Sequence, residues 1–291
     1  QAVQITHDRN GKVDGVLYID TKTKALHRQE AKVVCVAGNS IETPRLFLMS
    51  ASSMFPNGLA NSSDQVGRNY MRHLTGSVYA RFDKPVNFYR GETMAGFLAD
   101  EVKNNPKRGF VGGYYLETLA LGPSFMGAFL EPGGWGKKFA DMMDGYRNLA
   151  GMWIVGEDMP QANNRITLGS AKDAFGLPAP NVHFDDHPND TAMRNHAYNV
   201  GEKIYKSVGA KQTWRTTPYP HTHNLGTMRM SAKKKDGVTN KWGRCHDIKN
   251  LFVSDGSVMT TGAACNPTLT IVALAIRQGE YLADQLKKGK I

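Results

Sequence analysis

Residues 250–291 read NLFVSDGSVMTTGAACNPTLTIVALAIRQGEYLADQLKKGKI, and this stretch decides the fold. It begins with the apolar run Leu251-Phe252-Val253, which predicts a short buried strand. Ser254-Asp255-Gly256 is a turn signal that ends the strand, and a loop rich in small residues follows. Asn266 and Pro267 then predict the start of a long helix, with Asn at the N-cap and Pro at the first helical position.

The predicted C-terminal helix has an apolar stripe at helical spacing, formed by Leu269, Val272, Ala273, Ile276 and Leu282. A run of two lysines and a glycine at residues 287–289 predicts its end. The first turn of such a helix presents unpaired backbone N–H groups and the positive end of the helix dipole. A strand that leads through an acidic turn to a helix N-terminus is therefore suited to binding a cofactor.

A second stretch, residues 221–230, reads HTHNLGTMRM. From His223 onward it has the pattern His-x-x-Gly-Thr-x-x-Met, and Asp255-Gly256 and Asn266-Pro267 follow it in order. Together these features resemble the C-terminal signature of the glucose–methanol–choline (GMC) flavoprotein oxidoreductases. Within that family the chain is most similar to bacterial sugar and sugar-acid dehydrogenases of the gluconate dehydrogenase type.

The resemblance implies an enzyme that binds FAD and oxidises a CH–OH group of a sugar, sugar acid or other alcohol, with hydride transfer to flavin N5. It implies that His223 is the base, or the hydrogen-bond partner of the substrate oxygen, a role that suits neutral imidazole. Asn266 would hold the same oxygen and orient the alcohol. From the residues alone, His223 would be a buried structural histidine and Asn266 a plain N-cap.

The resemblance also implies a set of cofactor contacts. Asp255 and Gly256 would touch the ribityl or pyrophosphate portion of FAD, where a side chain in place of Gly would hold the cofactor away. The helix that starts at Pro267 would present Thr268 and nearby N–H groups to the negative charge of reduced flavin, and Asn266 would face the cofactor as well. The alternative for Asp255 is an ordinary turn residue.

The chain has 291 residues, enough for one large domain or two smaller ones, and a formal net charge of +10. Its Lys and Arg residues are mostly scattered, with clusters only at residues 233–235 and at the C-terminus. We therefore interpret the charge as a solvated surface, since no recognised motif supports the alternative of a nucleic-acid binder. No apolar run is long enough to span a bilayer. The three cysteines form no CxxC pair and predict no disulfide framework.

The chain is expected to begin inside a sheet. Residues 3–5 alternate between apolar and polar side chains, which predicts a strand. Asp8-Arg9-Asn10-Gly11 is a turn signal, and Val13–Ile19 is predicted to return as a second strand. No G-x-G-x-x-G dinucleotide fingerprint is present in the sequence. We therefore expect the C-terminal half of a flavoenzyme, which needs an N-terminal FAD-binding half or a separate subunit as partner. The compartment is not determined, because any export signal would lie on that half.

Residues 31–38 predict a buried strand that ends in Gly, and Thr43-Pro44 predicts the start of a helix through residue 49. Residues 66–69 read Val-Gly-Arg-Asn, which resembles the family segment that leads into the substrate domain. His73 follows, and we interpret it as structural rather than catalytic. The alternative for the strand and helix is a βα unit of any α/β protein.

From residue 75 to about residue 218 the pattern changes to short strands separated by Gly- and Pro-rich loops. Strands are predicted at residues 78–82, 110–116, 152–155, 163–168 and 182–184. A helix capped by Asp190 or Thr191 is predicted to end at Gly209. Aromatic residues of this segment are candidates for a sugar pocket or, alternatively, core and loop anchors: Tyr114, Tyr115, Phe125, Phe129, Trp135 and Trp153.

The expected fold is α/β combined with α+β: part of a Rossmann-like FAD-binding domain plus a substrate domain with an antiparallel sheet backed by helices. Residues 1–73 would belong to the FAD-binding domain, 74–218 would form the substrate domain, and 219–291 would return to the FAD-binding domain with the catalytic His and Asn. The antiparallel sheet and its helices come from the family resemblance, since periodicity alone supports only an α+β insert.

Two alternatives remain open. His221, His223, Cys245 and His246 are chemically suitable zinc ligands, although their spacing matches no strong signature. The chain is alternatively a catalytically inactive fragment or a non-catalytic partner subunit. For the enzyme itself, a quinone, a dye, a cytochrome or oxygen would accept the electrons, and the sequence does not choose among them.

Overall fold

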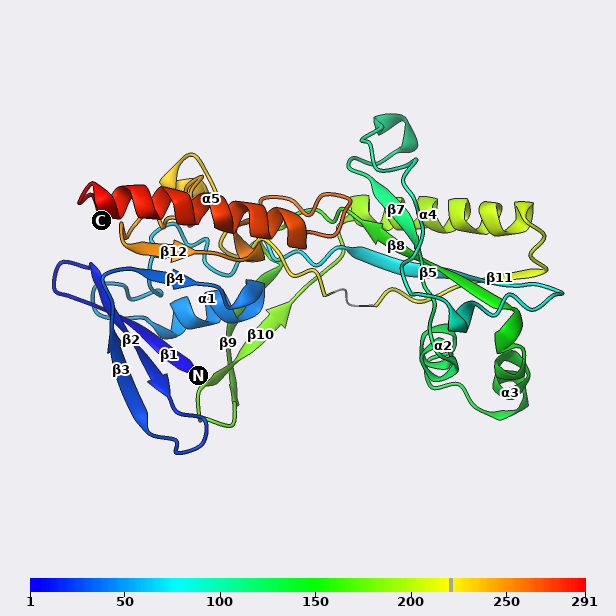
Figure 1. Cartoon of the computed structure of the whole chain (residues 1–291), viewed down its shortest axis with the longest axis horizontal. Coiled ribbons are helices and arrows are strands. Elements are labelled where there is room, and N and C mark those ends of the chain that lie inside the picture. Colours follow the sequence, from blue (N-terminus) through cyan, green and yellow to red (C-terminus); the bar gives the residue numbers. More distant parts are fainter. Residues whose placement is uncertain (220–221) are drawn as a thin grey trace.

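The computed structural model describes residues 1–219 and 222–291, so His221 lies outside the described residues. The molecule is elongated, with two lobes joined by a narrower middle, and both termini lie in the same lobe (Figure 1). Among the described residues, no helix has the length and apolar character needed to cross a bilayer.

The lobe that holds both termini, called the terminal lobe below, contains these elements: β1 (Ala2–His7), β2 (Val13–Ile19), β3 (Leu26–Glu30), β4 (Val34–Val36), α1 (Asn39–Met49), β9 (Arg165–Lys172), β10 (Pro178–His183), β12 (Leu251–Val253) and α5 (Thr268–Lys287). The other lobe, called the sheet lobe, contains β5 (Leu74–Arg81), β6 (Phe97–Leu98), β7 (Tyr114–Thr118), α2 (Pro123–Leu130), α3 (Gly136–Asp144), β8 (Leu149–Gly156), α4 (Pro188–Ser207) and β11 (Gln212–Arg215). Short 3-10 helices are η1 (Phe88–Arg90), η2 (Pro106–Arg108), η3 (Tyr146–Asn148), η4 (Lys234–Asp236) and η5 (Gly256–Val258).

The predicted N-terminal hairpin is confirmed as β1 and β2, which pair antiparallel, and β3 extends the sheet on the far side of β2. We did not predict β3, because its five residues, LHRQE, are all exposed and show no apolar alternation.

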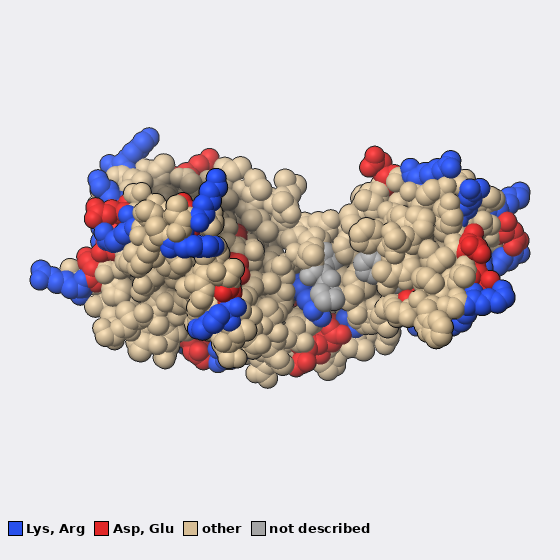
Figure 2. Space-filling model, turned by 90° about the horizontal axis from the view of Figure 1, so that it is seen from below, with Lys and Arg blue, Asp and Glu red and all other residues tan. Residues whose placement is uncertain are grey.

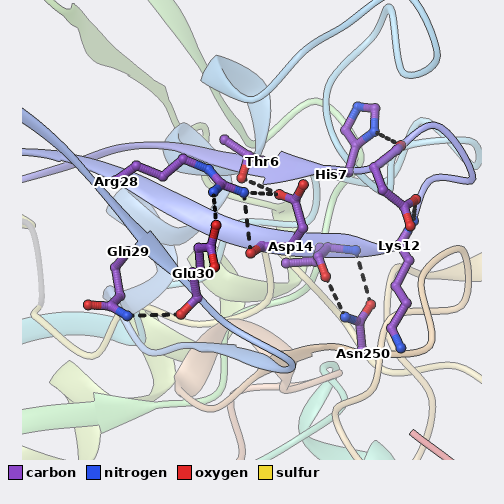
Figure 3. A network of polar contacts seen from close by, with 10 residues as sticks. Thr6, His7, Lys12, Asp14, Arg28, Gln29, Glu30 and Asn250 are labelled. Carbon is purple, nitrogen blue, oxygen red and sulfur yellow. Dashed lines mark hydrogen bonds and ion pairs between the residues drawn. The ribbon is translucent and has the colours of Figure 1, made fainter.

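Buried Asn250 ties this sheet to the start of β12. Its side chain accepts from the N–H of Val13 at 3.1 Å and donates to the Val13 carbonyl at 2.7 Å (Figure 3). Arg28 links the strands on the outer side through Asp14 and Glu30 (Figure 3).

β4 and β12 form a two-stranded parallel sheet, with Phe252 opposite Cys35. The predicted buried strand at residues 31–38 is therefore confined to Val34–Val36. The predicted start of α1 at Thr43-Pro44 was wrong: the helix begins at Asn39, and Pro44 lies inside it. The side-chain oxygen of Asn39 accepts hydrogen bonds from the N–H groups of Ile41 and Glu42, so the first turn of the helix is stabilised before the proline.

α5 is present as predicted and ends at Lys287, followed by Gly289 with φ of +61°. Its start is one residue later than predicted, with Pro267 at the N-cap and no side-chain cap, so Asn266 is not the cap. The predicted stripe is mostly exposed in this chain: Leu269 is 82% exposed, Val272 48% and Ile276 61%. The opposite side of the helix packs against the rest of the terminal lobe. On that side Gln278 is buried and donates a hydrogen bond to the Val253 carbonyl of β12.

The sheet lobe is built on a five-stranded antiparallel sheet in the order β11-β5-β8-β7-β6. Successive residues of β5 point to opposite faces: Val78 packs under α4, whereas Tyr79 packs with Met126 of α2. The strand predicted at residues 110–116 starts only at Tyr114. α4 starts earlier than predicted, because His187 is the N-cap and Asp190 is the third helical residue of a capping box.

The β9–β10 hairpin leaves the sheet lobe and packs against α1 in the terminal lobe. Buried Arg45 of α1 holds it, with an ion pair to Asp173 at 2.6 Å and a hydrogen bond to the Pro178 carbonyl at 2.8 Å. On the face drawn in Figure 2, Lys and Arg side chains are interspersed with Asp and Glu on both lobes, and no continuous basic surface is visible.

Candidate active site

His223 pairs with His73, which directly precedes β5. The two Nδ1 atoms are 3.0 Å apart and the rings meet edge to face, with centroids 5.0 Å apart. The other ring nitrogen of His73, Nε2, lies 2.8 Å from the carbonyl oxygen of Gly262. The pair therefore connects His223 to the loop that leads into α5.

Burial keeps both imidazoles neutral. It lowers the pKa of His73, and it lowers the pKa of His223 to about 4, with a further contribution from His73 itself. A neutral His223 is able to accept a proton over the whole physiological pH range.

Asn266 lies four residues beyond Gly262 on the same loop. Its side-chain oxygen Oδ1 accepts a hydrogen bond of 2.8 Å from the hydroxyl of Tyr115 on β7. Burial raises the pKa of Tyr115, so the phenol stays protonated and remains a donor. With Oδ1 held by Tyr115, the amide NH2 is the group of Asn266 that is directed elsewhere. This contact explains why Asn266, although placed next to a helix start, does not cap it.

The carboxylate of Asp255 is fully occupied within the chain. Oδ1 accepts from the N–H of Ser257 at 2.9 Å and from its hydroxyl at 2.5 Å. Oδ2 accepts from the N–H of Asn39 at 3.0 Å and from the Thr43 hydroxyl at 2.6 Å. A carboxylate has about four acceptor positions, and all four are used here. Asp255 thus joins the end of β12 to the start of α1, and only its backbone remains for a further contact.

Gly256 stands where three segments meet. A Cβ at this position would lie 2.9 Å from the Asn224 carbonyl oxygen and 3.0 Å from side-chain atoms of Leu225 and Ile271. The carbonyl of Gly256 also accepts a hydrogen bond from Gly226 at 3.3 Å. The absence of a side chain is therefore required by the chain's own packing beside the His223 segment.

Pro267 is buried and its carbonyl accepts the first helical hydrogen bond from Ile271, at 2.9 Å. Thr268 is exposed at the first position of α5. Since no side chain caps this helix, its first-turn N–H groups are available to an acceptor. The helix begins near the middle of the molecule and runs outward to the C-terminus (Figure 1).

Three residues that sequence reasoning did not assign to the site belong to this arrangement: His73, Tyr115 in this role, and Asp158. Asp158 is buried two residues after β8, and its Oδ2 accepts a 2.7 Å hydrogen bond from the N–H of Arg72. The pairing of Leu74 with Gly156 across β5 and β8 brings these two segments together. The sequence offered one signal for His73, which follows the Val-Gly-Arg-Asn segment. It offered no motif or local pattern that would have identified Asp158 as a site residue.

The five aromatic candidates whose side chains the structure describes do not gather in one pocket. Tyr114 is buried in the sheet-lobe core, while its neighbour Tyr115 reaches Asn266. Phe125 and Trp135 are exposed on or beside α2 and α3, and Trp153 packs with Tyr79. The side chain of Phe129 lies outside the described residues. Tyr115 is hydrogen-bonded to a predicted site residue, Asn266.

In the part of the chain that the structure describes, no group of three His, Cys, Asp or Glu side chains is arranged to hold a metal ion. Cys245 is buried, which raises its thiol pKa, and His246 lies 3.1 Å from the Ser231 hydroxyl. The zinc alternative also invoked His221, which is outside the described residues.

Comparisons with known proteins agree with the sequence motif. Residues 160–275 match the family model described as GMC oxidoreductase. The chain is 39% identical to 2-methyl-1,2-propanediol dehydrogenase of Mycolicibacterium austroafricanum, over 97% of this chain and 53% of that protein. It is 31% identical to the fructose dehydrogenase large subunit of Gluconobacter japonicus, over 97% of this chain and 52% of that protein. Among solved structures, formate oxidase of Aspergillus oryzae RIB40 matches with a TM-score of 0.72 at 17% identity, over 99% of this chain and 60% of that chain.

The chain spans about half the length of the curated relatives it matches. The likeness to formate oxidase, at 17% identity, shows the fold alone.

Proposed function

Because the chain belongs to the GMC oxidoreductase family, we propose that it is the C-terminal portion of an FAD-dependent dehydrogenase that oxidises a CH–OH group of a sugar, sugar acid or other alcohol. One observation carries the proposal: half-buried His223 is linked through His73 to the Gly262 carbonyl of the loop before α5, and exposed Asn266, at the end of the same loop, is held by the hydroxyl of Tyr115. A base and an amide held at one loop suit an alcohol group, whose oxygen needs both a proton acceptor and a donor.

The described residues fit FAD. The carboxyl ends of the parallel strands β4 and β12 lie side by side, which is where open α/β sheets bind cofactors. The uncapped N-terminus of α5, with Thr268 exposed, suits a negative charge. We assign the cofactor contacts to the backbone of Asp255 and Gly256 and to Asn266, Pro267 and Thr268. FAD supplies a two-electron acceptor for the hydride that leaves the carbinol carbon.

The chain's own residues supply the proton chemistry. His223 is neutral because burial lowers its pKa to about 4, so its imidazole accepts the hydroxyl proton of the alcohol. The NH2 of Asn266, directed by Tyr115, donates to the same oxygen and fixes its position. Neither residue has to change its protonation state before the substrate binds.

The domain division at residues 73 and 218 is part of this proposal. Residues 1–73 and 219–291 would belong to one FAD-binding domain, and the pairing of β4 with β12 supports this because it joins the two segments. Residues 74–218 would form the substrate domain, with β9 and β10 of that segment packed on α1. A Rossmann-like sheet would be completed by strands that this chain does not contain.

The partner is an N-terminal half or a separate subunit that covers α5. Leu269, Val272 and Ile276 form an exposed apolar face on this helix, of the kind that another protein surface covers. The name of the Gluconobacter relative describes it as the large subunit of fructose dehydrogenase, which is consistent with an assembled enzyme. A quinone or cytochrome acceptor for the electrons would belong to such an assembly.

The test uses the complete protein with its FAD. Substrate-driven loss of flavin absorbance should become at least about 100-fold slower in His223→Ala, the range that general-base catalysis contributes, while bound FAD is unchanged. The matched control is His196→Ala, which removes another partly buried imidazole, hydrogen-bonded to Tyr114 in the sheet lobe. An unchanged rate in His223→Ala would refute the role of this residue. An absence of FAD from the complete native protein would refute the flavoenzyme itself.

A further inference from the structure

The hydrogen bonds around His73 determine which of its nitrogens carries the proton. The carbonyl oxygen of Gly262 only accepts, so the Nε2 of His73, 2.8 Å away, must donate to it. In a neutral imidazole the other nitrogen then carries a lone pair. The Nδ1 of His73 is therefore an acceptor.

The same reasoning extends to His223. Its Nδ1 lies 3.0 Å from the Nδ1 of His73 and must supply the proton of that hydrogen bond. With the proton on Nδ1, the basic lone pair of neutral His223 is on Nε2. The opposite arrangement would require His73 to be doubly protonated, and its burial, at 2% exposed, disfavours that charge.

His73 is held in place by an unusual backbone. Its φ is +61°, a left-handed conformation that costs a residue other than Gly roughly 1 kcal/mol or more. Buried Asp158 accepts a 2.7 Å hydrogen bond from the N–H of Arg72, the residue before His73, and the Oδ1 of Asp158 lies on the same side of Gly262 as the His73 ring. A strained residue held by buried partners indicates that its side chain has to be in one particular place.

We propose that His73 is a positioning residue, which holds the proton of His223 on Nδ1 and so makes Nε2 the atom that takes up the substrate's hydroxyl proton. The proposal rests on the proposed function and names the reacting atom within it. Gly262 is the fixed end of the chain of hydrogen bonds, because its backbone carbonyl cannot change role. The order is Gly262 carbonyl, His73, His223 and then the alcohol.

The direct test is the tautomer of His223 in the complete protein labelled with 15N-histidine. Two-bond 1H–15N correlation spectra distinguish an Nδ1–H from an Nε2–H imidazole, and His223→Ala identifies the signal. The expected result for the native protein is Nδ1–H on His223 and Nε2–H on His73. Finding Nε2–H on His223 would overturn the proposal. This readout does not depend on turnover, so it fails or succeeds separately from the proposed function.

Two substitutions extend the test. His73→Leu removes the acceptor, and His73→Asn keeps an oxygen acceptor close to the position of Nδ1 and tolerates positive φ. In His73→Leu, the proton of His223 should move to Nε2. The value of kcat should fall about 10- to 100-fold, which is part of the rate enhancement that general-base catalysis contributes, while KM changes less than about 3-fold. His73→Asn should retain Nδ1–H and recover most of kcat. Equal losses in both variants with an unchanged His223 tautomer would overturn the proposal.

Discussion

Replacing Asp158 with Asn is expected to stabilise the protein at pH 8 and to have little effect at pH 5. The Asp158 side chain is buried, and its Oδ1 has no hydrogen-bond partner among the described residues. Burial raises the pKa of this carboxyl to about 7, and neighbouring Asp190 contributes to the rise. The folded protein therefore favours the protonated form of Asp158, whereas the unfolded chain ionises at an ordinary pKa.

The magnitude follows from that difference. Between the unfolded and folded pKa values, the free energy of unfolding falls by about 1.4 kcal/mol for each pH unit. Ionisation of Asp158 thus lowers the free energy of unfolding by about 3 kcal/mol between pH 5 and pH 7. It lowers it little more above pH 7, where Asp158 is ionised in both the folded and the unfolded chain. The introduced amide cannot ionise, so the free energy of unfolding of the variant does not fall in this way as pH rises. Its oxygen still accepts from the N–H of Arg72, and the weaker bond costs about 1 kcal/mol at every pH.

The assay is urea unfolding of the complete protein at pH 5, 6, 7 and 8 at constant ionic strength, followed by tryptophan fluorescence. The difference in free energy of unfolding between Asp158→Asn and the native protein should rise by about 3 kcal/mol across this range in favour of the variant. Asp144→Asn, which removes an exposed carboxyl at the end of α3, is the control and should show no such rise. The reasoning would be refuted if the difference in free energy of unfolding stayed constant with pH, or if the variant became less stable relative to the native protein as pH rises.

Three further predictions concern the site of the complete enzyme. Because burial lowers the pKa of His223 to about 4, a pH–rate profile of kcat/KM with a non-ionising alcohol should show its acid limb near pH 4. Tyr115→Phe should lower kcat about 10-fold in steady-state kinetics, because the amide of Asn266 loses the donor that orients it. Gly256→Ala should lower the free energy of unfolding by about 1 to 3 kcal/mol in urea titrations, because the added Cβ would lie 2.9 Å from a carbonyl oxygen.

Two of these predictions have a control within the chain. Tyr114→Phe removes the neighbouring hydroxyl, which bonds to His196 in the sheet lobe, and should leave kcat unchanged. Gly122→Ala adds a Cβ with no atom within 4 Å and should change stability by less than about 0.5 kcal/mol. An acid limb near pH 6.5, equal effects of the two tyrosine variants, or equal effects of the two glycine variants would each contradict the corresponding prediction.

Local elements were predicted where the signal itself is local. The strands Val13–Ile19 and Leu251–Val253 have the predicted bounds, because apolar runs and turn residues lie within a few positions of each other. The helix starts were less accurate: α4 is capped by His187, since Asp190 serves as the third helical residue. α5 shows a further limit, because it is apolar on more than one side, and periodicity did not identify the side that packs within this chain.

The site was predicted only as far as its motifs extend. His223 and Asn266 stood out because they occur in order with a Gly-Thr pair, an Asp-Gly turn and a proline. Their partners carried no comparable signal. His73 looked structural, and Tyr115 was one aromatic residue among six candidates.

The sequence by itself indicated the resemblance to the GMC oxidoreductases, several of the strands and helices, and the two residues that we assign to the chemistry. Those properties depend on residue types at short spacings, which are written in the chain directly. Only the tertiary structure decided the partners of these residues: His73 is 150 positions from His223, and Tyr115 is 151 positions from Asn266. Pairs so far apart meet because β5, β7 and β8 pair in one sheet beside the loop before α5. The protonation and orientation of the site follow from that pairing, because burial and hydrogen-bond geometry exist only in the folded chain.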